Sequence, residues 1–281
     1  MKILDFLLAC LVVFIWASDF PIGKVGVSYY TPLLFLSARS IISFIVTFPF
    51  IKSDIQPVPL NLIIFLSFSQ FLMHSGLFIA LWLGIDISLS IILMQMSVPF
   101  SLIFAFIYYN EKISWRQILG VVITFFGVVI AVGDIHIGSI IPILFVLLSA
   151  LGLAWFNLLL KIYPEQDGAS VISYSSFGVF ILFTPLSYFI EDPYLLLIRN
   201  APLDAVFSVI YLGVMSVFAW FIWYYLLGKY KLSMISPFQL LVPVCGIVLS
   251  TIIFEHSLTM QLVLAIIIVF VGHVITMFAS K

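Results

Sequence analysis

Two apolar stretches of the sequence carry a glutamine, a proline and a glutamate at the same mutual spacing. Residues 95–114 read QMSVPFSLIFAFIYYNEKIS, and residues 239–257 read QLLVPVCGIVLSTIIFEHS. Amide and carboxylate side chains can bind solutes or exchange protons, and such groups are costly inside an apolar run. These stretches are therefore the first candidates for chemistry.

The prolines of the two stretches suggest a substrate cavity. A proline inside a helix donates no backbone hydrogen bond, so the carbonyl four residues earlier is left free. For Pro99 and Pro243 those carbonyls belong to Gln95 and Gln239. If the stretches cross a membrane, these groups must find partners or line a wet cavity. We expect all four residues to line the cavity, although the prolines could serve packing and the glutamines could bond neighbouring helices.

Two charged residues lie inside other apolar runs. Arg39 is about seven residues, or about 10 Å, into the run 32–51, and Asp19 lies at a comparable depth in the run 4–22. Arginine stays protonated, so it must pair, snorkel or face water. The Asp19–Arg39 pair could attract a substrate carboxylate or act as a gate, or it could be a static link between two helices.

Further residues could complete a binding cavity. Gln70 and His74 are four residues apart and share one helix face, and the histidine could take up a proton. Four more polar or aromatic residues within apolar runs are expected in the cavity wall: Trp16, Asn157, Trp220 and Tyr224. Aromatic residues also form interfacial belts, which is the alternative here. Such a cavity suits an amphiphilic, zwitterionic or neutral solute.

The two glutamates are expected to fix turns. Glu111 and Glu255 stand at the ends of apolar runs, and Ser114 with Gln117 predicts a capping box at the start of the next helix. Because these glutamates lie at helix ends and not in the middle of the membrane, they are not expected to carry protons across it. His273, beside a glycine in the last run, is expected to be a packing residue.

Composition identifies the environment of these residues. The 281 residues are 64% hydrophobic and 8% charged, whereas soluble domains are about half apolar and a quarter charged. This composition indicates a polytopic membrane protein in contact with the lipid bilayer. The net charge of −1 gives no basis for nucleic-acid binding. Two cysteines are too few for a disulfide framework, the four histidines lack metal-ligand spacing, and no cofactor is expected.

Ten apolar runs are long enough to span a bilayer as helices. Their residues do not alternate as barrel strands do. The approximate limits are 4–22, 32–51, 60–82, 88–109, 115–133, 139–161, 170–190, 203–228, 233–254 and 259–279. An even number places both termini on one side. Eight basic residues then fall on that side and two on the other, which predicts cytoplasmic termini.

The chain repeats itself after 144 residues. This shift pairs Gln95 with Gln239, Pro99 with Pro243, Glu111 with Glu255 and Gln117 with Gln261. Five spans separate the copies, and because five is odd the halves 3–133 and 139–279 must have opposite orientations. Inverted five-helix repeats are typical of secondary transporters.

Small residues seven apart mark the last span of each half. They are Gly120 with Gly127, and Ala265 with Gly272. This spacing permits close helix contact, so spans five and ten are expected to be scaffold helices or the contact of a homodimer.

The sequence resembles the EamA family of the drug/metabolite transporter superfamily, within it an exporter branch for amino-acid metabolites. The resemblance rests on WASDFPIGKVG in span one, Arg39 in span two and the Pro–Glu element of spans four and nine, and it covers the whole chain. It implies export of small metabolites, such as cysteine or O-acetylserine, by alternating access through a central cavity. Relatives are expected to carry an amide where this chain has Asp19.

Two other functions remain alternatives. An intramembrane lipid-processing enzyme would need a nucleophile and a base at one depth, and the sequence has neither an H-E-x-x-H nor a G-x-S-x-G motif. We therefore expect no enzymatic activity. A transporter of the same fold could instead carry a drug, a nucleotide-like solute or a carboxylate metabolite. No Walker motif is present, so ATP hydrolysis is not expected.

Overall fold

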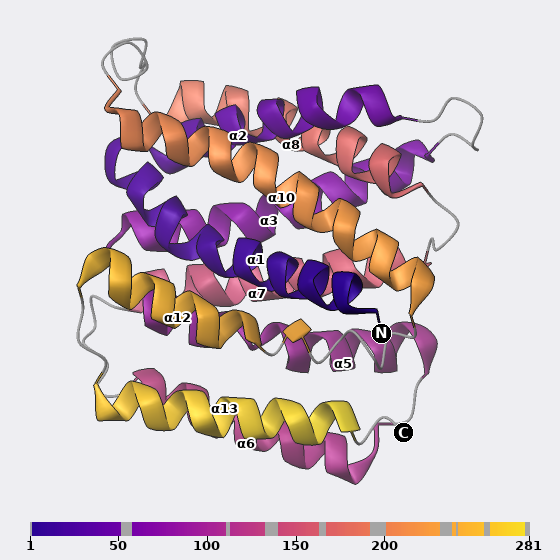
Figure 1. Cartoon of the computed structure of the whole chain (residues 1–281), viewed down its shortest axis with the longest axis vertical. Coiled ribbons are helices and arrows are strands. Elements are labelled where there is room, and N and C mark those ends of the chain that lie inside the picture. Colours follow the sequence, from indigo (N-terminus) through magenta and orange to yellow (C-terminus); the bar gives the residue numbers. More distant parts are fainter. Residues whose placement is uncertain are drawn as a thin grey trace.

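The structure is a computed structural model that describes residues 2–51, 58–110, 113–132, 140–162, 167–191, 201–230, 238–239, 241–255 and 259–278. The described elements are all helical (Figure 1). The first half contains α1 (Ile3–Tyr29), α2 (Pro32–Thr47), η1 (Phe48–Phe50), α3 (Leu60–Trp82), α4 (Ile87–Met94), α5 (Ser97–Tyr109) and α6 (Trp115–Val132). The second contains α7 (Ile140–Ile162), α8 (Gly168–Ile190), α10 (Leu203–Lys229), α12 (Leu241–Phe254) and α13 (Met260–Phe278).

The prediction of an all-α polytopic membrane protein is confirmed. Within the described ranges, eight helical segments are long and apolar enough to cross a membrane, and α12 and α13 provide two shorter apolar helices. The predicted limits 133, 139 and 279 of the two halves lie outside the described residues.

Helix α1 is longer than predicted. It continues past Pro21 to Tyr29, whereas the apolar run was expected to end at residue 22. The Lys24 ammonium donates a hydrogen bond to the Leu81 carbonyl at the end of α3. The Lys24 ammonium, which interrupts the apolar run, therefore has a hydrogen-bond partner inside the protein, and the helix continues past Lys24.

Span four is broken where a kink was expected. Helix α4 ends at Met94 and α5 begins at Ser97. The Val98 N–H donates to the Gln95 carbonyl at 3.1 Å, so the expectation of a free carbonyl at Gln95 was wrong. The tight turn brings an amide from one residue before Pro99 to replace the missing donor. Pro99 then lies in the first turn of α5, where proline is tolerated.

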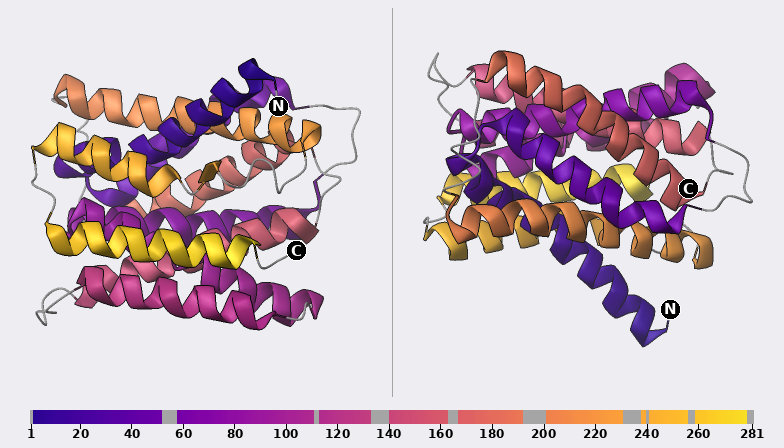
Figure 2. Two further views of the ribbon diagram at one scale, coloured as in Figure 1. Left: turned by 60° about the horizontal axis from the view of Figure 1, so that its bottom comes forward. Right: turned by 90° about the horizontal axis from the view of Figure 1, so that it is seen from above.

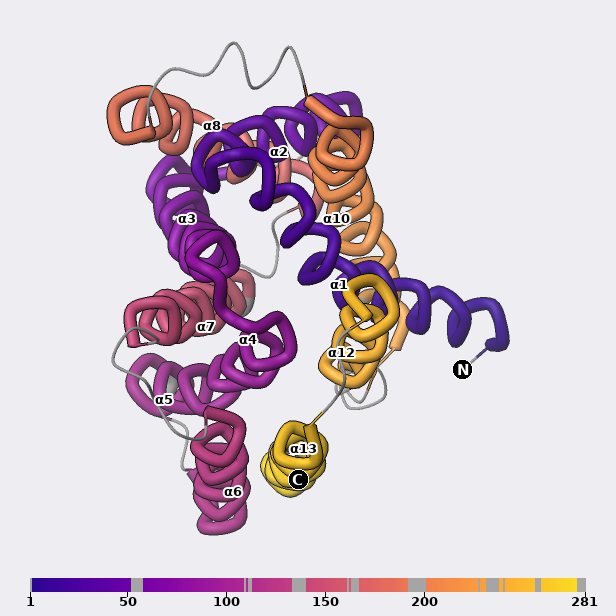
Figure 3. The backbone as a smooth tube through the Cα atoms, turned by 90° about the vertical axis from the view of Figure 1, so that its left-hand side faces the viewer, coloured from indigo at the N-terminus to yellow at the C-terminus, as the bar shows by residue number. Residues whose placement is uncertain are grey.

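Equivalent helices of the two halves make equivalent contacts. Helix α1 packs on α10 and α12 in the way that α7 packs on α3 and α5. The equivalent helices α2 and α8 pack on each other at one end of the molecule, and α6 and α13 do so at the other (Figure 3). In the first pair, Ser37 lies 2.7 Å from Thr184 and Phe44 lies 4.7 Å from Phe177, so the helices are antiparallel. Equivalent helices that run antiparallel are what inverted repeats require.

The predicted small-residue helices pack on each other. Helices α6 and α13 lie side by side along one edge (Figure 2, left). A Cβ on Gly120 would lie 2.6 Å from the Gly272 carbonyl, and one on Gly127 would lie 3.1 Å from the Ala265 carbonyl. The stripes therefore form a close seam within the chain.

Candidate functional site

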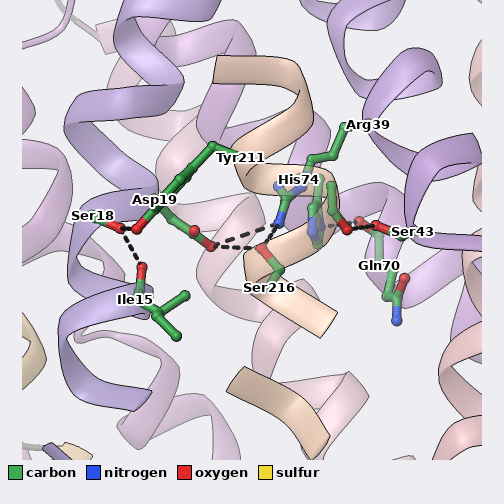
Figure 4. A network of polar contacts seen from close by, with 10 residues as sticks. Ile15, Ser18, Asp19, Arg39, Ser43, Gln70, His74, Tyr211 and Ser216 are labelled. Atoms are coloured by element: carbon green, nitrogen blue, oxygen red, sulfur yellow. Dashed lines mark hydrogen bonds and ion pairs between the residues drawn. The ribbon is translucent and has the colours of Figure 1, made fainter. Parts of the chain in front are cut away.

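The two charged residues predicted as partners meet inside the helical bundle. Arg39 Nη2 of α2 lies 3.6 Å from Asp19 Oδ2 of α1, and their side chains are 7% and 20% exposed (Figure 4). The guanidinium also lies over the Phe78 ring of α3, 5.7 Å from its centroid. A cation over an aromatic face is attracted by the ring quadrupole.

A serine from the second half joins this pair. Arg39 Nη2 donates to Ser216 Oγ of α10 at 2.8 Å, and Ser216 Oγ donates to Asp19 Oδ2 at 3.5 Å. The site therefore combines residues from both halves of the chain. Sequence reasoning missed Ser216, because serines in membrane helices usually bond a carbonyl of their own helix.

The backbone of α10 explains why Ser216 reaches Arg39. A Cβ on Gly213 would lie 2.7 Å from Ile42 Cγ2 and 3.1 Å from the Arg39 carbonyl, so only a glycine allows α10 to lie this close to α2. Ser43 Oγ fastens the same contact by donating to the Gly213 carbonyl at 2.8 Å. A glycine three residues before a serine in an apolar run was the sequence signal available for this contact.

Two atoms of the charged pair have no hydrogen-bond partner among the described residues. They are Asp19 Oδ1 and Arg39 Nη1, and both are buried. A buried polar atom without a partner is uncommon, and it costs more when it belongs to a charged group. The pair is therefore held in place with one acceptor and one donor unused.

The predicted pair Gln70 and His74 divides between two contacts. His74 lies beside Arg39, and its Nδ1 is 3.2 Å from the Gln70 carbonyl (Figure 4). The Gln70 amide instead donates to Ser175 Oγ of α8 at 3.1 Å. His74 therefore lies next to the Arg39 guanidinium, and Gln70 belongs to the contact between α3 and α8.

Three of the four predicted wall residues form one aromatic cluster. The ring centroid of Trp220 lies 5.2 Å from Trp16 and 6.2 Å from Tyr224. Phe156 of α7 adds a fourth ring, 5.6 Å from Trp220. Asn157 is exposed and forms no hydrogen bond with the described residues. The cluster adjoins the charged pair, because Trp16 precedes Asp19 by one helical turn on α1.

The glutamine–proline residues lie elsewhere. Gln95 and Pro243 line a small pocket between α4, α12 and α13, together with Ile92, Val244, Ile266, Val269, Phe270 and His273. The Gln95 amide donates to the Ile91 carbonyl of its own helix at 3.2 Å. Gln239 is exposed just before α12 and is not among the residues that line this pocket. His273 is buried at the pocket, and its Nε2 has no hydrogen-bond partner among the described residues.

A residue with a positive φ follows the helix at the corresponding turn of each half. Glu255 follows α12 with a φ of 52°, and Asn110 ends α5 with a φ of 50°. Glu111 lies outside the described residues. The predicted capping box is confirmed, because Ser114 N–H donates to Gln117 Oε1 at 2.8 Å and Gln117 N–H donates to Ser114 Oγ at 3.2 Å.

Comparison with known proteins agrees with this architecture. Residues 4–133 and 140–278 each match the EamA-like transporter family. A protein of Escherichia coli strain K12 named a probable amino-acid metabolite efflux pump is 27% identical, over 99% of this chain and 96% of that protein. A protein of Salmonella typhimurium with the same name is 28% identical, over 94% and 92% of the two chains.

A solved crystal structure shares the fold. It superposes with a TM-score of 0.73 at 12% sequence identity, over 100% of this chain and 99% of that one. Because the family model matches both halves of the sequence, the chain belongs to the EamA-like transporter family.

Proposed function

We propose that this protein is a secondary transporter that exports amino acids or their derivatives, such as cysteine and O-acetylserine, by alternating access of its two halves. The two bacterial relatives named as amino-acid metabolite efflux pumps support this substrate class. The family supports transport over enzymatic activity.

The observation that carries the proposal is the position of the Asp19–Arg39–Ser216 network. Asp19 lies ten residues before the end of α1 at Tyr29, or about 15 Å, and Arg39 lies seven residues after the start of α2, or about 10 Å. Both are therefore well inside the bilayer. Ser216 comes from the other half, so a rocking motion between the halves would remake this site in each cycle.

The proposal includes a location and an orientation. The excess of basic residues beside the termini supports an inner-membrane protein with both ends in the cytoplasm. A homodimer could use the outer faces of α6 and α13, which expose the apolar residues Leu119, Val122, Phe126, Leu264, Ile267 and Val271.

Transport by the purified protein tests the proposal. Proteoliposomes preloaded with unlabelled solute are given labelled cysteine, O-acetylserine or each of the protein amino acids, and saturable exchange is measured. We expect exchange of at least one of them. Exchange of none, together with turnover of lipid by the same preparation, would indicate the intramembrane enzyme instead.

The same assay tests the glutamines. If Gln95 and Gln239 contact substrate, the Gln95→Ala/Gln239→Ala variant should lose exchange while it elutes as folded protein. Retained exchange would remove these residues from the proposed site.

A further inference from the structure

The charged pair offers two unused binding atoms of opposite character. Asp19 Oδ2 pairs with Arg39 Nη2 and accepts a hydrogen bond from Ser216. Arg39 Nη2 also donates a hydrogen bond to Ser216. Asp19 Oδ1 remains as a buried anionic acceptor, and Arg39 Nη1 remains as a buried cationic donor. The contacts present thus involve one oxygen of the Asp19 carboxylate and one terminal nitrogen of the Arg39 guanidinium.

A second ion pair on the same helix has no such unused carboxylate oxygen. Asp5 of α1 lies 2.9 Å from Lys229 Nζ of α10. Its Oδ1 accepts from the Tyr225 hydroxyl at 3.3 Å, and its Oδ2 accepts from the Tyr230 hydroxyl at 2.5 Å. Both oxygens of Asp5 are satisfied, whereas Asp19 has one that is not.

We propose, on the basis of the proposed function, that the Asp19–Arg39 pair recognises the α-amino acid itself. The substrate ammonium binds Asp19 and the substrate carboxylate binds Arg39. The Asp19 and Arg39 side chains separate as the substrate enters. When the site is empty they close on each other again. No covalent bond or proton transfer is involved.

Charge balance selects the ligand class. The pair carries no net charge, and neither does a zwitterion, so the exchange leaves every buried charge with a partner. A plain amine would leave Arg39 unpaired, and a plain carboxylate would leave Asp19 unpaired. A buried charge that loses its only partner is strongly destabilising. The site therefore favours solutes that carry both charges.

The aromatic cluster determines which side chain the zwitterion carries. Trp16 is one turn from Asp19 on α1, Trp220 is one turn from Ser216 on α10, and their rings are 5.2 Å apart. A substrate held by Asp19 and Arg39 would direct its side chain toward these rings. Anionic side chains are disfavoured there, because the ring faces offer no partner for a second anion.

The proposal also predicts that transport moves no net charge. Asp19 must be ionised to hold the ammonium, so it does not carry a proton with the substrate. The initial rate of net uptake into proteoliposomes that contain no amino acid should then be unchanged when a potassium gradient and valinomycin impose a membrane potential. A rate that follows the imposed potential would overturn the proposal.

Competition by matched analogues is the direct test. Exchange of labelled cysteine is measured under reducing conditions against cysteamine, which lacks the carboxylate, and 3-mercaptopropionate, which lacks the ammonium. A parallel set uses leucine, isoamylamine and 4-methylpentanoate. We expect each single-charge analogue to compete about tenfold or more weakly than the amino acid, since each loses a charge-assisted hydrogen bond.

Two variants separate recognition from folding. Asp19→Asn removes the acceptor for the ammonium while Arg39 keeps its charge, so 3-mercaptopropionate should compete about tenfold better than in the wild type. If this variant does not fold, Asp19→Asn/Arg39→Gln removes both charges together, and amino-acid exchange should fall about a hundredfold. Asp5→Asn breaks the other ion pair of α1 and should exchange at the wild-type rate.

The outcomes distinguish this proposal from the proposed function. If amino acids are exchanged but the single-charge analogues compete equally well, the ion-pair proposal is overturned and the export function stands. If no amino acid is exchanged, both are overturned. Wild-type selectivity in the Asp19→Asn/Arg39→Gln variant would likewise overturn the ion-pair proposal.

Discussion

Helix α1 carries two carboxylates, each paired with a base, and the two pairs differ in almost every other respect. Asp5 meets Lys229 near the end of the helix, where Lys229 is 35% exposed and two tyrosine hydroxyls complete the contact. Asp19 meets Arg39 deep in the bundle, where Arg39 is only 7% exposed and a serine is the third member. The pair that lies deep in the bundle is the less completely satisfied, because Asp19 Oδ1 and Arg39 Nη1 have no hydrogen-bond partner among the described residues.

This difference teaches how to distinguish a structural ion pair from a site. Where a pair serves only to join helices, saturation of its hydrogen bonds lowers the cost of burial. The Asp5 contact follows this pattern, and Figure 2 (right) shows why it is needed, since the N-terminal part of α1 projects beyond the other helices. The Asp19–Arg39 contact instead leaves Asp19 Oδ1 and Arg39 Nη1 without partners among the described residues. These atoms would contribute to stability only when a ligand binds them.

The largest expected effect comes from Arg39→Gln. This variant leaves the Asp19 carboxylate buried without a cation, and breaking a buried pair in this way costs about 3–5 kcal/mol of folding free energy. Reversible unfolding in mixed detergent–SDS micelles measures the loss, and exchange should be abolished.

The matched variant is Asp19→Asn/Arg39→Gln. Because it leaves no unpaired charge, most of the lost folding free energy should return, while exchange stays about a hundredfold below that of the wild type. Recovery of exchange along with stability would show that the pair is only structural, and the contrast with Asp5 would then disappear.

Removal of the bridge between the halves should have the next largest effect. Ser216→Ala leaves Arg39 Nη2 with Asp19 at 3.6 Å as its remaining polar contact and should cost about 1–3 kcal/mol of folding free energy. The half-saturation concentration for exchange should rise about tenfold, because the pair is less well oriented. Ser208→Ala on the same helix is the control, since the Ser208 hydroxyl donates to the Ala205 carbonyl of α10 and to no other described residue. Equal effects of the two changes would contradict a bridging role for Ser216.

Much of the fold could be predicted from the sequence, because apolar run length and helix geometry determine it. The bounds of α3 match the predicted run 60–82, and the pairing of Asp19 with Arg39 followed from their similar depth. Span four was different. Whether Pro99 kinks or breaks a helix depends on whether a nearby amide can reach the Gln95 carbonyl, and that is a property of the folded turn.

The limits of sequence reasoning were sharper at the site. Ser216 could not be chosen among the many serines of the chain, because its importance comes from the close approach of α10 to α2 at Gly213. Asp5 was missed for the opposite reason. A carboxylate near a helix end needs no special explanation, so its tyrosine partners 220 and 225 residues away left no local signal.

Lys229→Gln should have a smaller effect than either change at the site. Lys229 is partly exposed, and although the Asp5 side chain is buried, the two tyrosine hydroxyls still bind its carboxylate when the lysine is removed. The melting temperature in detergent should fall less than in Ser216→Ala, and exchange should stay within about twofold of wild type. Loss of exchange without loss of folded protein would mean that this end of α1 takes part in the transport cycle.

The smallest effect is expected from Tyr211→Phe, which removes a hydroxyl close to the charged network but not bonded to it. The Tyr211 hydroxyl lies 2.8 Å from Ser18 Oγ, and Ser18 also donates to the Ile15 carbonyl at 2.7 Å. Because Ser18 keeps that second partner, the change should cost less than about 1 kcal/mol of folding free energy. Exchange should be unchanged, since neither Asp19 nor Arg39 loses a contact. Impairment of exchange by Tyr211→Phe as strong as that by Ser216→Ala would contradict this prediction. The binding site would then include the hydroxyl groups around Asp19 and Arg39 as well as Asp19 Oδ1 and Arg39 Nη1.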